Sequence, residues 1–336
     1  MGSHLTEALL EQGNEVVGVD GFTDFYSREA KYDNLARART SDRFSLVEGH
    51  LTELDVDRLL EGVAGVFHLA AQAGVRGSWG NSFSVYLTDN VLSTQRLFEG
   101  VARAAIRIVF ASSSSVYGNA ETYPTTEATP PRPISPYGVT KLACEQLMHA
   151  FRSELGLDAV ALRYFSVYGP RQRPDMAFTR MLSALLAGEV FTVHGSGRQT
   201  RDFTFAADAV AATMAAMDAP SPGNVYNVCG GSETSLRDVI HISEELVGRR
   251  LKVENDARAV GDVHRTAGDG TRIRRDLGWA PSTTLREGLA AHIGWLEDPR
   301  NFPSSFGDRS ARRKSSRQED RRSLPSVAAS SLVRAD

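Results

Sequence analysis

The chain has 336 residues and a formal net charge of −3, and 41% of its residues are hydrophobic and 24% charged. This composition is that of an ordinary globular protein, and it excludes a collagen-like, low-complexity or strongly basic nucleic-acid-binding chain. Residues 300–336 differ, because nine Lys and Arg stand there against four Asp and Glu and the apolar periodicity disappears. We expect a disordered, solvated basic tail in that segment. A docking site or a nucleic-acid-binding patch is the alternative interpretation of its Arg-Arg-Lys run.

Cysteine usage and hydropathy narrow the setting of the protein. The two cysteines, Cys144 and Cys229, lie far apart in the chain and have no His at ligand spacing. We therefore predict neither a disulfide framework nor a metal site. The sequence shows no apolar run near the roughly 18 residues that cross a membrane, and its first residues show no secretory signal pattern. These features favour a cytoplasmic protein with no membrane or nucleic-acid partner.

In chain order, the first predicted elements are a helix at 5–13 and a strand at 15–20 that ends at Asp20. Further short apolar runs, rich in Val, Ile and Phe, predict strands at 65–70, 107–112 and 158–165. Between the strands, apolar residues spaced three and four apart predict amphipathic helices at 90–105 and 141–156. Strands that alternate with helices predict an α/β fold, a doubly wound parallel sheet covered on both faces.

After about residue 166 the pattern loosens into shorter helices separated by turns rich in Gly and Pro. We interpret this half as a smaller substrate-binding lobe. The predicted division is a first domain over residues 1–165, the lobe over 166–299, with some segments returning to the sheet, and the tail over 300–336.

Candidate catalytic residues gather in the segment Ser-Pro-Tyr-Gly-Val-Thr-Lys. Tyr137 and Lys141 are four residues apart on a predicted helix, so both side chains lie on one face. A Lys ammonium held there can favour the phenolate of the Tyr, which has an unperturbed pKa of about 10, and so make it a base near neutral pH. The pair alone leaves open an ordinary surface Tyr and Lys.

A second signal is the run of hydroxyls that follows the strand at 107–112, in the segment Phe-Ala-Ser-Ser-Ser-Ser-Val-Tyr-Gly. Open α/β sheets bind ligands at the carboxyl ends of their strands. A strand-end Ser, the Tyr-x-x-x-Lys and the later Leu-Arg-Tyr-Phe-Ser-Val-Tyr-Gly-Pro-Arg follow one another in a fixed order. This ordered set resembles the extended short-chain dehydrogenase/reductase family, specifically the nucleotide-sugar epimerases and dehydratases, from Gly2 to about Trp295.

The resemblance implies a Rossmann-type sheet, NAD as cofactor and a catalytic set of Ser113, Tyr137 and Lys141. It implies that Asp20 binds the adenosine ribose, although a simple turn Asp remains the alternative. Asn90 would support the nicotinamide side, or merely begin a helix. The remaining implied cofactor contacts, besides Tyr137 and Lys141 themselves, are Gly2, Leu69, Ala70 and Ala71.

The residues after Ser113 bear on the reaction. Related dehydratases place an Asp-Glu pair where this chain has Ser114 and Ser115, so the resemblance argues against dehydration. Together with neighbouring motifs, these hydroxyls make the chain most similar to UDP-glucuronate 4-epimerases, which invert C4 through transient NAD-dependent oxidation. The implied residues for the UDP-sugar substrate are Arg76, Ser114, Ser166, Arg173 and Arg201, with surface charge as the alternative for Arg76 and Arg173.

Other functions remain open at this point. A UDP-glucose 4-epimerase or a UDP-glucuronate decarboxylase would carry a similar set of residues. In relatives, helices matching 90–105 and 137–155 form a homodimer interface, so we expect a homodimer.

The first residues, Met-Gly-Ser-His-Leu, continue directly into a predicted helix and Asp20, so we interpret them as native rather than as a tag. In the family, a strand and two further glycines precede the glycine that matches Gly2, and these cradle the pyrophosphate. We therefore expect impaired NAD binding and stability for the chain as written. A catalytically impaired or silent relative that retains sugar-nucleotide binding or dimerisation is the corresponding alternative.

Overall fold

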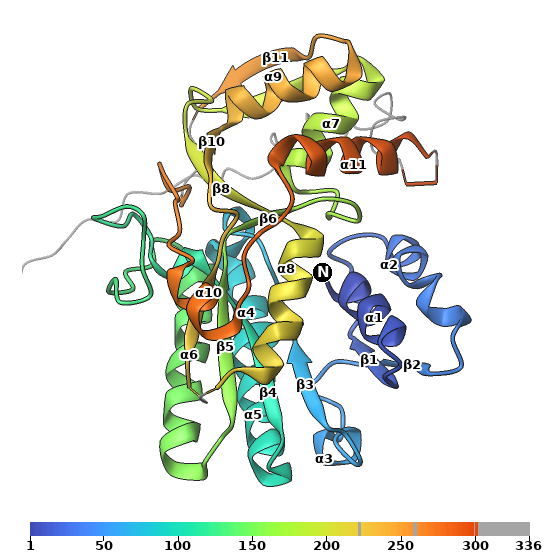
Figure 1. The fold of residues 1–336 in the computed structure, drawn as a ribbon, viewed down its shortest axis with the longest axis vertical. Helices are drawn as coiled ribbons and strands as arrows, with labels where there is room; N and C mark the ends of the chain where they lie inside the picture. The colour runs from blue at the N-terminus through green and yellow to red at the C-terminus, as the bar shows by residue number, and fades with distance from the viewer. Residues whose placement is uncertain (221–222, 258–260, 299, 302–336) are drawn as a thin grey trace, which may run out of the picture.

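The computed structural model describes residues 1–220, 223–257, 261–298 and 300–301. The predicted basic tail lies outside the described residues, apart from its first two positions. Two parallel sheets dominate the first half of the chain (Figure 1). The larger sheet has, in spatial order, the strands β3 (Gly65–His68), β4 (Arg107–Ser113), β5 (Ala159–Tyr164) and β9 (Val225–Val228). The smaller sheet pairs β1 (Val16–Asp20) with β2 (Phe44–Glu48).

The larger sheet is buried on both faces. Successive residues of β4 enter different cores, because Ile108 and Phe110 pack on one side of the sheet and Val109 on the other. The first side is covered by α3 (Val56–Leu59), α5 (Ser93–Ala104) and α6 (Pro136–Leu155). The second side is covered by α8 (Ala206–Ala215) and α10 (Thr271–Leu277). The predicted doubly wound α/β fold is therefore confirmed, and its near-continuous apolar runs follow from this two-sided burial.

A third core belongs to the smaller lobe at the top of Figure 1. It packs α7 (Ala177–Ala187), α9 (Leu236–Val247) and α11 (Leu285–Glu297) around apolar side chains such as Phe178 and Phe203, whose ring centroids are 4.6 Å apart. Two small sheets complete the lobe. Their strands are β6 (Ser166–Tyr168), β7 (Val190–His194), β8 (Thr200–Phe205), β10 (Glu233–Ser235) and β11 (Lys252–Asp256).

The remaining helices lie at the edges of the sheets and in the connections. The α-helices are α1 (Gly2–Glu11), α2 (Arg28–Leu35) and α4 (Phe83–Tyr86), and the short 3₁₀ helices are η1 (Ala38–Thr40), η2 (Arg76–Ser78), η3 (Gly80–Ser82), η5 (Ser114–Val116) and η6 (Ala216–Asp218). A π-helical segment, η4 (Leu87–Leu92), leads into α5. The predicted helix at 90–105 therefore begins in a π-helix, and strand β2 had not been predicted.

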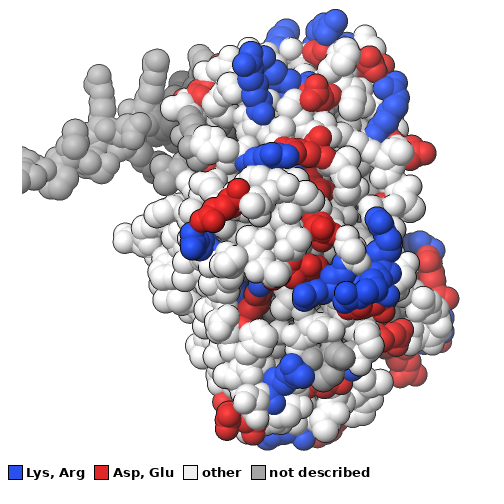
Figure 2. All heavy atoms as spheres, turned by 60° about the vertical axis from the view of Figure 1, so that its left-hand side comes forward, with Lys and Arg blue, Asp and Glu red and all other residues white. Residues whose placement is uncertain are grey.

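The surface carries charges of both signs. On the face in Figure 2, basic and acidic side chains lie beside each other. In the described structure, pairs such as Arg132 with Glu121 and Arg275 with Asp276 have N···O distances of 2.6 Å.

Both cysteine thiols are free and buried. Among the described residues, no helix has the length and apolarity needed to cross a bilayer, and no cluster of three or more His, Cys, Asp or Glu could hold a metal ion.

The buried His292 in α11 makes stability sensitive to acid. Burial lowers the pKa of its imidazole in the folded protein from 6.5 to about 4. Between these two pH values the imidazole of the unfolded chain is protonated while that of the folded chain stays neutral, so acid favours unfolding. Stability should fall by up to roughly 3 kcal/mol between pH 7 and pH 4 on this account. Urea unfolding across this range should show a flatter profile for His292→Leu, whereas His241→Leu, at an exposed position of α9, should keep the wild-type slope.

Candidate active site

The predicted catalytic residues meet at the carboxyl edge of the larger sheet. Ser113 is the last residue of β4, and Tyr137 is the second residue of α6, which packs against η5 and β4. Ser166 follows the end of β5, the strand parallel to β4. Because the strands run parallel, their carboxyl ends share one edge, and three separate segments deliver side chains to it.

Tyr137 is half-buried and lies edge-on against the ring of Tyr86, at a centroid distance of 6.3 Å. Burial raises the pKa of its phenol, whereas a hydrogen bond with the Ser113 side chain and the positive charge of Arg173 lower it. The structure therefore joins two residues of the predicted catalytic set, Ser113 and Tyr137, and adds Arg173 to their surroundings. Such a phenol can exchange a proton with a hydroxyl placed against Ser113.

Lys141 lies one turn further along α6 and points toward β4. Its Nζ donates a hydrogen bond to the carbonyl oxygen of Ala111 at 2.8 Å and lies 5.0 Å from the centre of the Phe110 ring. Burial lowers the pKa of the ammonium to about 8, while Cys144 and Glu145 act in the opposite direction. Arg173 thus supplies a positive charge that lowers the pKa of Tyr137, an effect that the sequence argument expects of Lys141.

Three residues within one turn, Ser135, Pro136 and Gly138, fix the start of α6. Ser135 caps the helix, its Oγ accepting a hydrogen bond from the Gly138 amide at 3.1 Å, and Pro136 occupies the first turn. A Cβ at Gly138 would lie 2.5 Å from the carbonyl oxygen of Ser115. Glycine therefore allows α6 to approach η5 closely enough to place Tyr137 beside Ser113.

The predicted cofactor residues lie at the end of β1, directly after β3 and at the start of α1. Asp20 ends β1, where its Oδ1 accepts hydrogen bonds from the Phe22 amide at 2.6 Å and from Lys31 Nζ at 3.1 Å. The residues Leu69, Ala70 and Ala71 come directly after β3 and are at least partly exposed. Gly2 is the exposed first residue of α1.

Asn90 is buried in η4 and connects three segments. Its Oδ1 accepts a hydrogen bond from the Gln72 amide at 2.7 Å, and its Nδ2 donates to the Gln72 carbonyl at 3.1 Å and to Thr140 Oγ1 at 3.0 Å. The side chain thus ties the loop after β3 to α6, next to the catalytic residues. This placement is more specific than that of a residue that merely begins a helix. His68, at the end of β3, is also a buried structural residue, with Nε2 2.8 Å from Thr94 Oγ1.

The predicted substrate residues lie in different surroundings. Ser114 begins η5 and Ser166 begins β6, both partly exposed. Arg173 donates two hydrogen bonds to the carboxylate of Asp175, at 2.9 and 3.0 Å. The other two arginines contact one segment, because Arg76 pairs with Asp262 at 2.8 Å and Arg201 donates to the carbonyl oxygens of Val263 at 2.7 Å and His264 at 3.4 Å.

Sequence reasoning identified neither Tyr86 as part of the site nor the pairing of Asp262 with Arg76. Tyr86 packs against Tyr137, and its hydroxyl donates to the carbonyl oxygens of Ala73 and Gly74 at 3.2 and 2.8 Å. No local pattern distinguishes it from other aromatic residues. Asp262 lies 186 residues from its partner Arg76, a separation at which spacing carries no signal.

Comparison with known families matches this arrangement. Residues 1–292 match the family described as GDP-mannose 4,6 dehydratase. The chain belongs to this extended short-chain dehydrogenase/reductase family. Ser113 and Tyr137, which lie together at the carboxyl edge of the larger sheet, belong to the motifs on which the sequence resemblance was based.

Individual members of the family are similar to the chain over most of its length. The uncharacterized UDP-glucose epimerase YtcB of Bacillus subtilis (strain 168) is 39% identical over 299 residues, which covers 88% of this chain and 94% of the relative. The UDP-glucuronate 4-epimerase of Thermodesulfobacterium geofontis (strain OPF15) is 32% identical, covering 89% and 93% of the two chains. The structure of UDP-glucuronic acid 4-epimerase from Bacillus cereus with UDP-glucuronic acid and NAD has a TM-score of 0.86 at 36% identity, covering 89% and 96%. These comparisons place the chain among NAD-dependent nucleotide-sugar epimerases.

Proposed function

We propose that this enzyme is a UDP-glucuronate 4-epimerase. The observation that carries the proposal is the set of hydroxyls that ends β4 and begins η5, at Ser113 and Ser114, next to Tyr137. Arg173, which pairs with Asp175 at 2.9 Å, adds a positive charge that acts on the same phenol. In a hexuronate the carboxylate is attached to C5, next to the carbon that is epimerised. A cation beside the residue that exchanges the C4 hydroxyl proton therefore suits a substrate with a negative charge at that neighbouring position.

Hydroxyl side chains support the same substrate. Ser114 and Ser166 offer neutral hydrogen-bond partners at the carboxyl edge of the sheet, where a carboxylate would repel the sugar acid. We assign them, with Arg173, to the sugar. Arg76 and Arg201 hold the segment around Asp262 and Val263, and we assign this region to the diphosphate end of the UDP-sugar.

The residues present fit NAD as the cofactor. The Asp20 side chain is 45% exposed at the end of β1, so its carboxylate can accept hydrogen bonds from ribose hydroxyls. Gly2 has open space where a Cβ would stand, at the start of α1. We propose that the cofactor is held by these two residues and by Leu69, Ala70, Ala71, Tyr137 and Lys141, with Asn90 as a support. When bound, NAD would accept the hydride from C4 and return it.

The chain's own residues handle the proton. Tyr137 accepts the proton of the sugar 4-hydroxyl while Ser113 donates a hydrogen bond to the same oxygen, and the sugar becomes a 4-ketone as C4 loses its hydride. The ketone then presents its opposite face and regains the hydride at C4, and Tyr137 returns the proton to the oxygen. No net oxidation occurs, and the product is the C4 epimer.

The substrate assignment is tested by supplying UDP-glucuronate and UDP-glucose separately and following the products by chromatography and mass spectrometry. The expected result is the 4-epimer of UDP-glucuronate, without carbon dioxide release or loss of water. Release of carbon dioxide would instead identify a decarboxylase. A failure to convert either substrate would support the catalytically silent alternative.

A UDP-glucose 4-epimerase is the second candidate, favoured by the 39% identity to YtcB. Arg173 discriminates between the two. Arg173→Gln should raise KM for UDP-glucuronate by about 30-fold, because the sugar carboxylate loses a charge-assisted hydrogen bond. KM for UDP-glucose, which has no carboxylate at this position, should be nearly unchanged. Arg132→Gln, which removes an exposed arginine paired with Glu121, serves as the control and should leave both constants unchanged. Equal changes in the two KM values on Arg173→Gln would contradict the assignment of Arg173 to the carboxylate, whereas a change in kcat common to both substrates would reflect its effect on Tyr137.

We propose that the enzyme is a homodimer in the cytoplasm. Large apolar side chains remain between 45% and 47% exposed on adjoining elements of the α4–α6 region, namely Val85, Leu87, Leu92 and Val139. Exposed apolar surface of this kind favours association. Leu92→Asp combined with Val139→Asp should shift the protein to monomer in sedimentation experiments, whereas Val253→Asp, on β11, should not. The two buried free thiols fit a reducing compartment.

A further inference from the structure

Glu145 lies on the same face of α6 as Tyr137 and Lys141, because the three residues follow one another at intervals of four. The residue is 1% exposed, and it pairs with the buried Arg163 of β5. Arg163 Nε donates to Oε1 at 2.9 Å and Nη2 donates to Oε2 at 2.7 Å. Apolar residues of similar volume are often at least as stabilising as a buried ion pair. Stability alone therefore does not account for two charges buried next to the active site.

The helix holds two consecutive residues of β4 from two consecutive turns. Lys141 Nζ donates to the carbonyl oxygen of Ala111 at 2.8 Å, and Glu145 Oε1 accepts a hydrogen bond from the hydroxyl of Ser112. The next residue along β4 is Ser113. These two contacts fix how far α6 lies along β4, and so fix the position of Tyr137 relative to Ser113.

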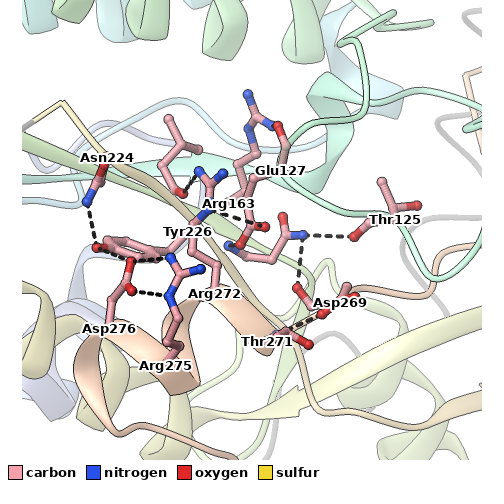
Figure 3. Close-up of polar contacts among 12 residues, drawn as sticks. Thr125, Glu127, Arg163, Asn224, Tyr226, Asp269, Thr271, Arg272, Arg275 and Asp276 are labelled. Atoms are coloured by element: carbon pink, nitrogen blue, oxygen red, sulfur yellow. Dashed lines mark hydrogen bonds and ion pairs between the residues drawn. The ribbon is translucent and has the colours of Figure 1, made fainter.

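Arg163 extends this arrangement away from α6 toward Thr125 and Asp269, and Figure 3 shows these three residues together. Its Nη1 donates to the hydroxyl of Tyr117 at 2.8 Å, and that hydroxyl donates to Asn227 Oδ1 at 2.7 Å. Asn227 Nδ2 then donates to the carbonyl oxygens of Thr125 at 2.9 Å and Asp269 at 3.3 Å. The side chains thus form a continuous hydrogen-bonded path from α6 through β5 and β9 to the segment that precedes α10.

We propose that Glu145 and Arg163 are positioning residues that hold Ser113 opposite Tyr137, a role that rests on the proposed epimerase function. Neither side chain reaches the substrate. They act through Ser112 and through the helix that carries both Tyr137 and Lys141.

Electrostatics supports this role at Lys141. Burial lowers the pKa of the ammonium, and Cys144 and Glu145 on α6 raise it. Because burial raises the pKa of the Cys144 thiol, which stays neutral near pH 7, the negative neighbour there is the Glu145 carboxylate. The other groups that face Lys141 are the ring of Phe110 on β4 and the imidazole of His68 at the end of β3. Burial, and to a smaller extent the charge of Lys141, lowers the pKa of His68 to about 3, so this imidazole stays neutral. The Glu145 carboxylate therefore helps to keep Lys141 charged near neutral pH.

The test replaces both charges at once, because a single substitution would leave an unpaired buried charge. Glu145→Leu with Arg163→Met keeps the volume apolar. Its control is Arg107→Met with Asp158→Leu, which removes an ion pair between the first residue of β4 and the residue before β5, at the opposite end of these strands from the active site. In that pair Arg107 Nε donates to both carboxylate oxygens at 3.0 Å. Ser112→Ala is a milder variant that retains the ion pair and removes one contact to Glu145.

The expected result for the double variant is a kcat lowered by about 100-fold with KM nearly unchanged, since small misplacements of reacting groups have effects of this size. The alkaline limb of its kcat profile should move to lower pH as Lys141 loses its negative neighbour. Ser112→Ala should lower kcat by about tenfold on the same reasoning. The control pair should change neither kcat nor the pH profile.

Titration of the Tyr137 phenol gives a readout that needs no turnover. Ultraviolet difference spectra against Tyr137→Phe should show a higher phenol pKa in the double variant, because the hydrogen bond from Ser113 that lowers it is lost. A folded double variant with unchanged kcat and unchanged titration would overturn the positioning role. If the wild type converts no nucleotide sugar but the titration still shifts, the proposed function fails and the positioning role stands. If the double variant does not fold, Ser112→Ala decides by the same two measurements.

Discussion

Tyr137→Phe should lower kcat for epimerisation by about 1,000-fold, the size expected when a proton-transfer group is removed. The substitution deletes only the phenol oxygen that exchanges a proton with the sugar. The remaining ring can still pack edge-on against Tyr86. Binding of the UDP-sugar should therefore be nearly unchanged, and the loss should appear in kcat rather than in KM.

Single-turnover and steady-state kinetics with UDP-glucuronate, the proposed substrate, measure this effect, and calorimetry measures binding of the UDP-sugar. The matched control is Tyr164→Phe, which removes a buried phenol hydroxyl that lies 2.6 Å from Thr213 Oγ1. It should cost about 1 kcal/mol of stability and leave kcat unchanged. Substantial turnover by a folded Tyr137→Phe enzyme would remove Tyr137 from its proposed role.

The larger sheet could be predicted from the sequence because its strands are buried on both faces. β4 and β5 appear as mostly apolar runs, with the buried Arg163 inside β5, and each was predicted within about two residues of its bounds. β2 was missed, since Phe44–Glu48 pairs only with β1 in the smaller sheet and includes partly and fully exposed residues. A short strand of mixed burial carries little periodic signal.

The proposed catalytic pair could be predicted from the sequence because it is local. Tyr137 and Lys141 share a helix face, and a spacing of four residues is visible in the sequence. The influence of Arg173 on Tyr137 depends on where the loop after β6 folds back, which no spacing reveals. Similarly, Lys141 is held by Ala111, and the direction of its side chain is set by packing against β4 rather than by its position on the helix.

Gly138→Ala should both destabilise the protein and impair catalysis. The new Cβ would stand 2.5 Å from the Ser115 carbonyl oxygen and 3.0 Å from Pro133 Cβ, so the start of α6 must move away from η5. Overpacking of this kind costs about 1–3 kcal/mol. Because Tyr137 is the adjacent residue, the same movement should separate it from Ser113 and lower kcat by about 100-fold.

Gly294→Ala is the matched control, since Gly294 also lies inside a helix, α11, but has nothing within 4 Å of the position of its Cβ. This substitution should stabilise the protein by about 0.5–1 kcal/mol through helix propensity alone, without changing kcat. Thermal unfolding and kinetics of both variants make the comparison. If Gly138→Ala instead behaved like Gly294→Ala, the close approach of α6 to η5 would have no role in bringing Tyr137 to Ser113. If Gly138→Ala destabilises the protein and lowers kcat while Gly294→Ala stabilises it and leaves kcat unchanged, Gly138 is required by the contact between α6 and η5 and not by the helix itself.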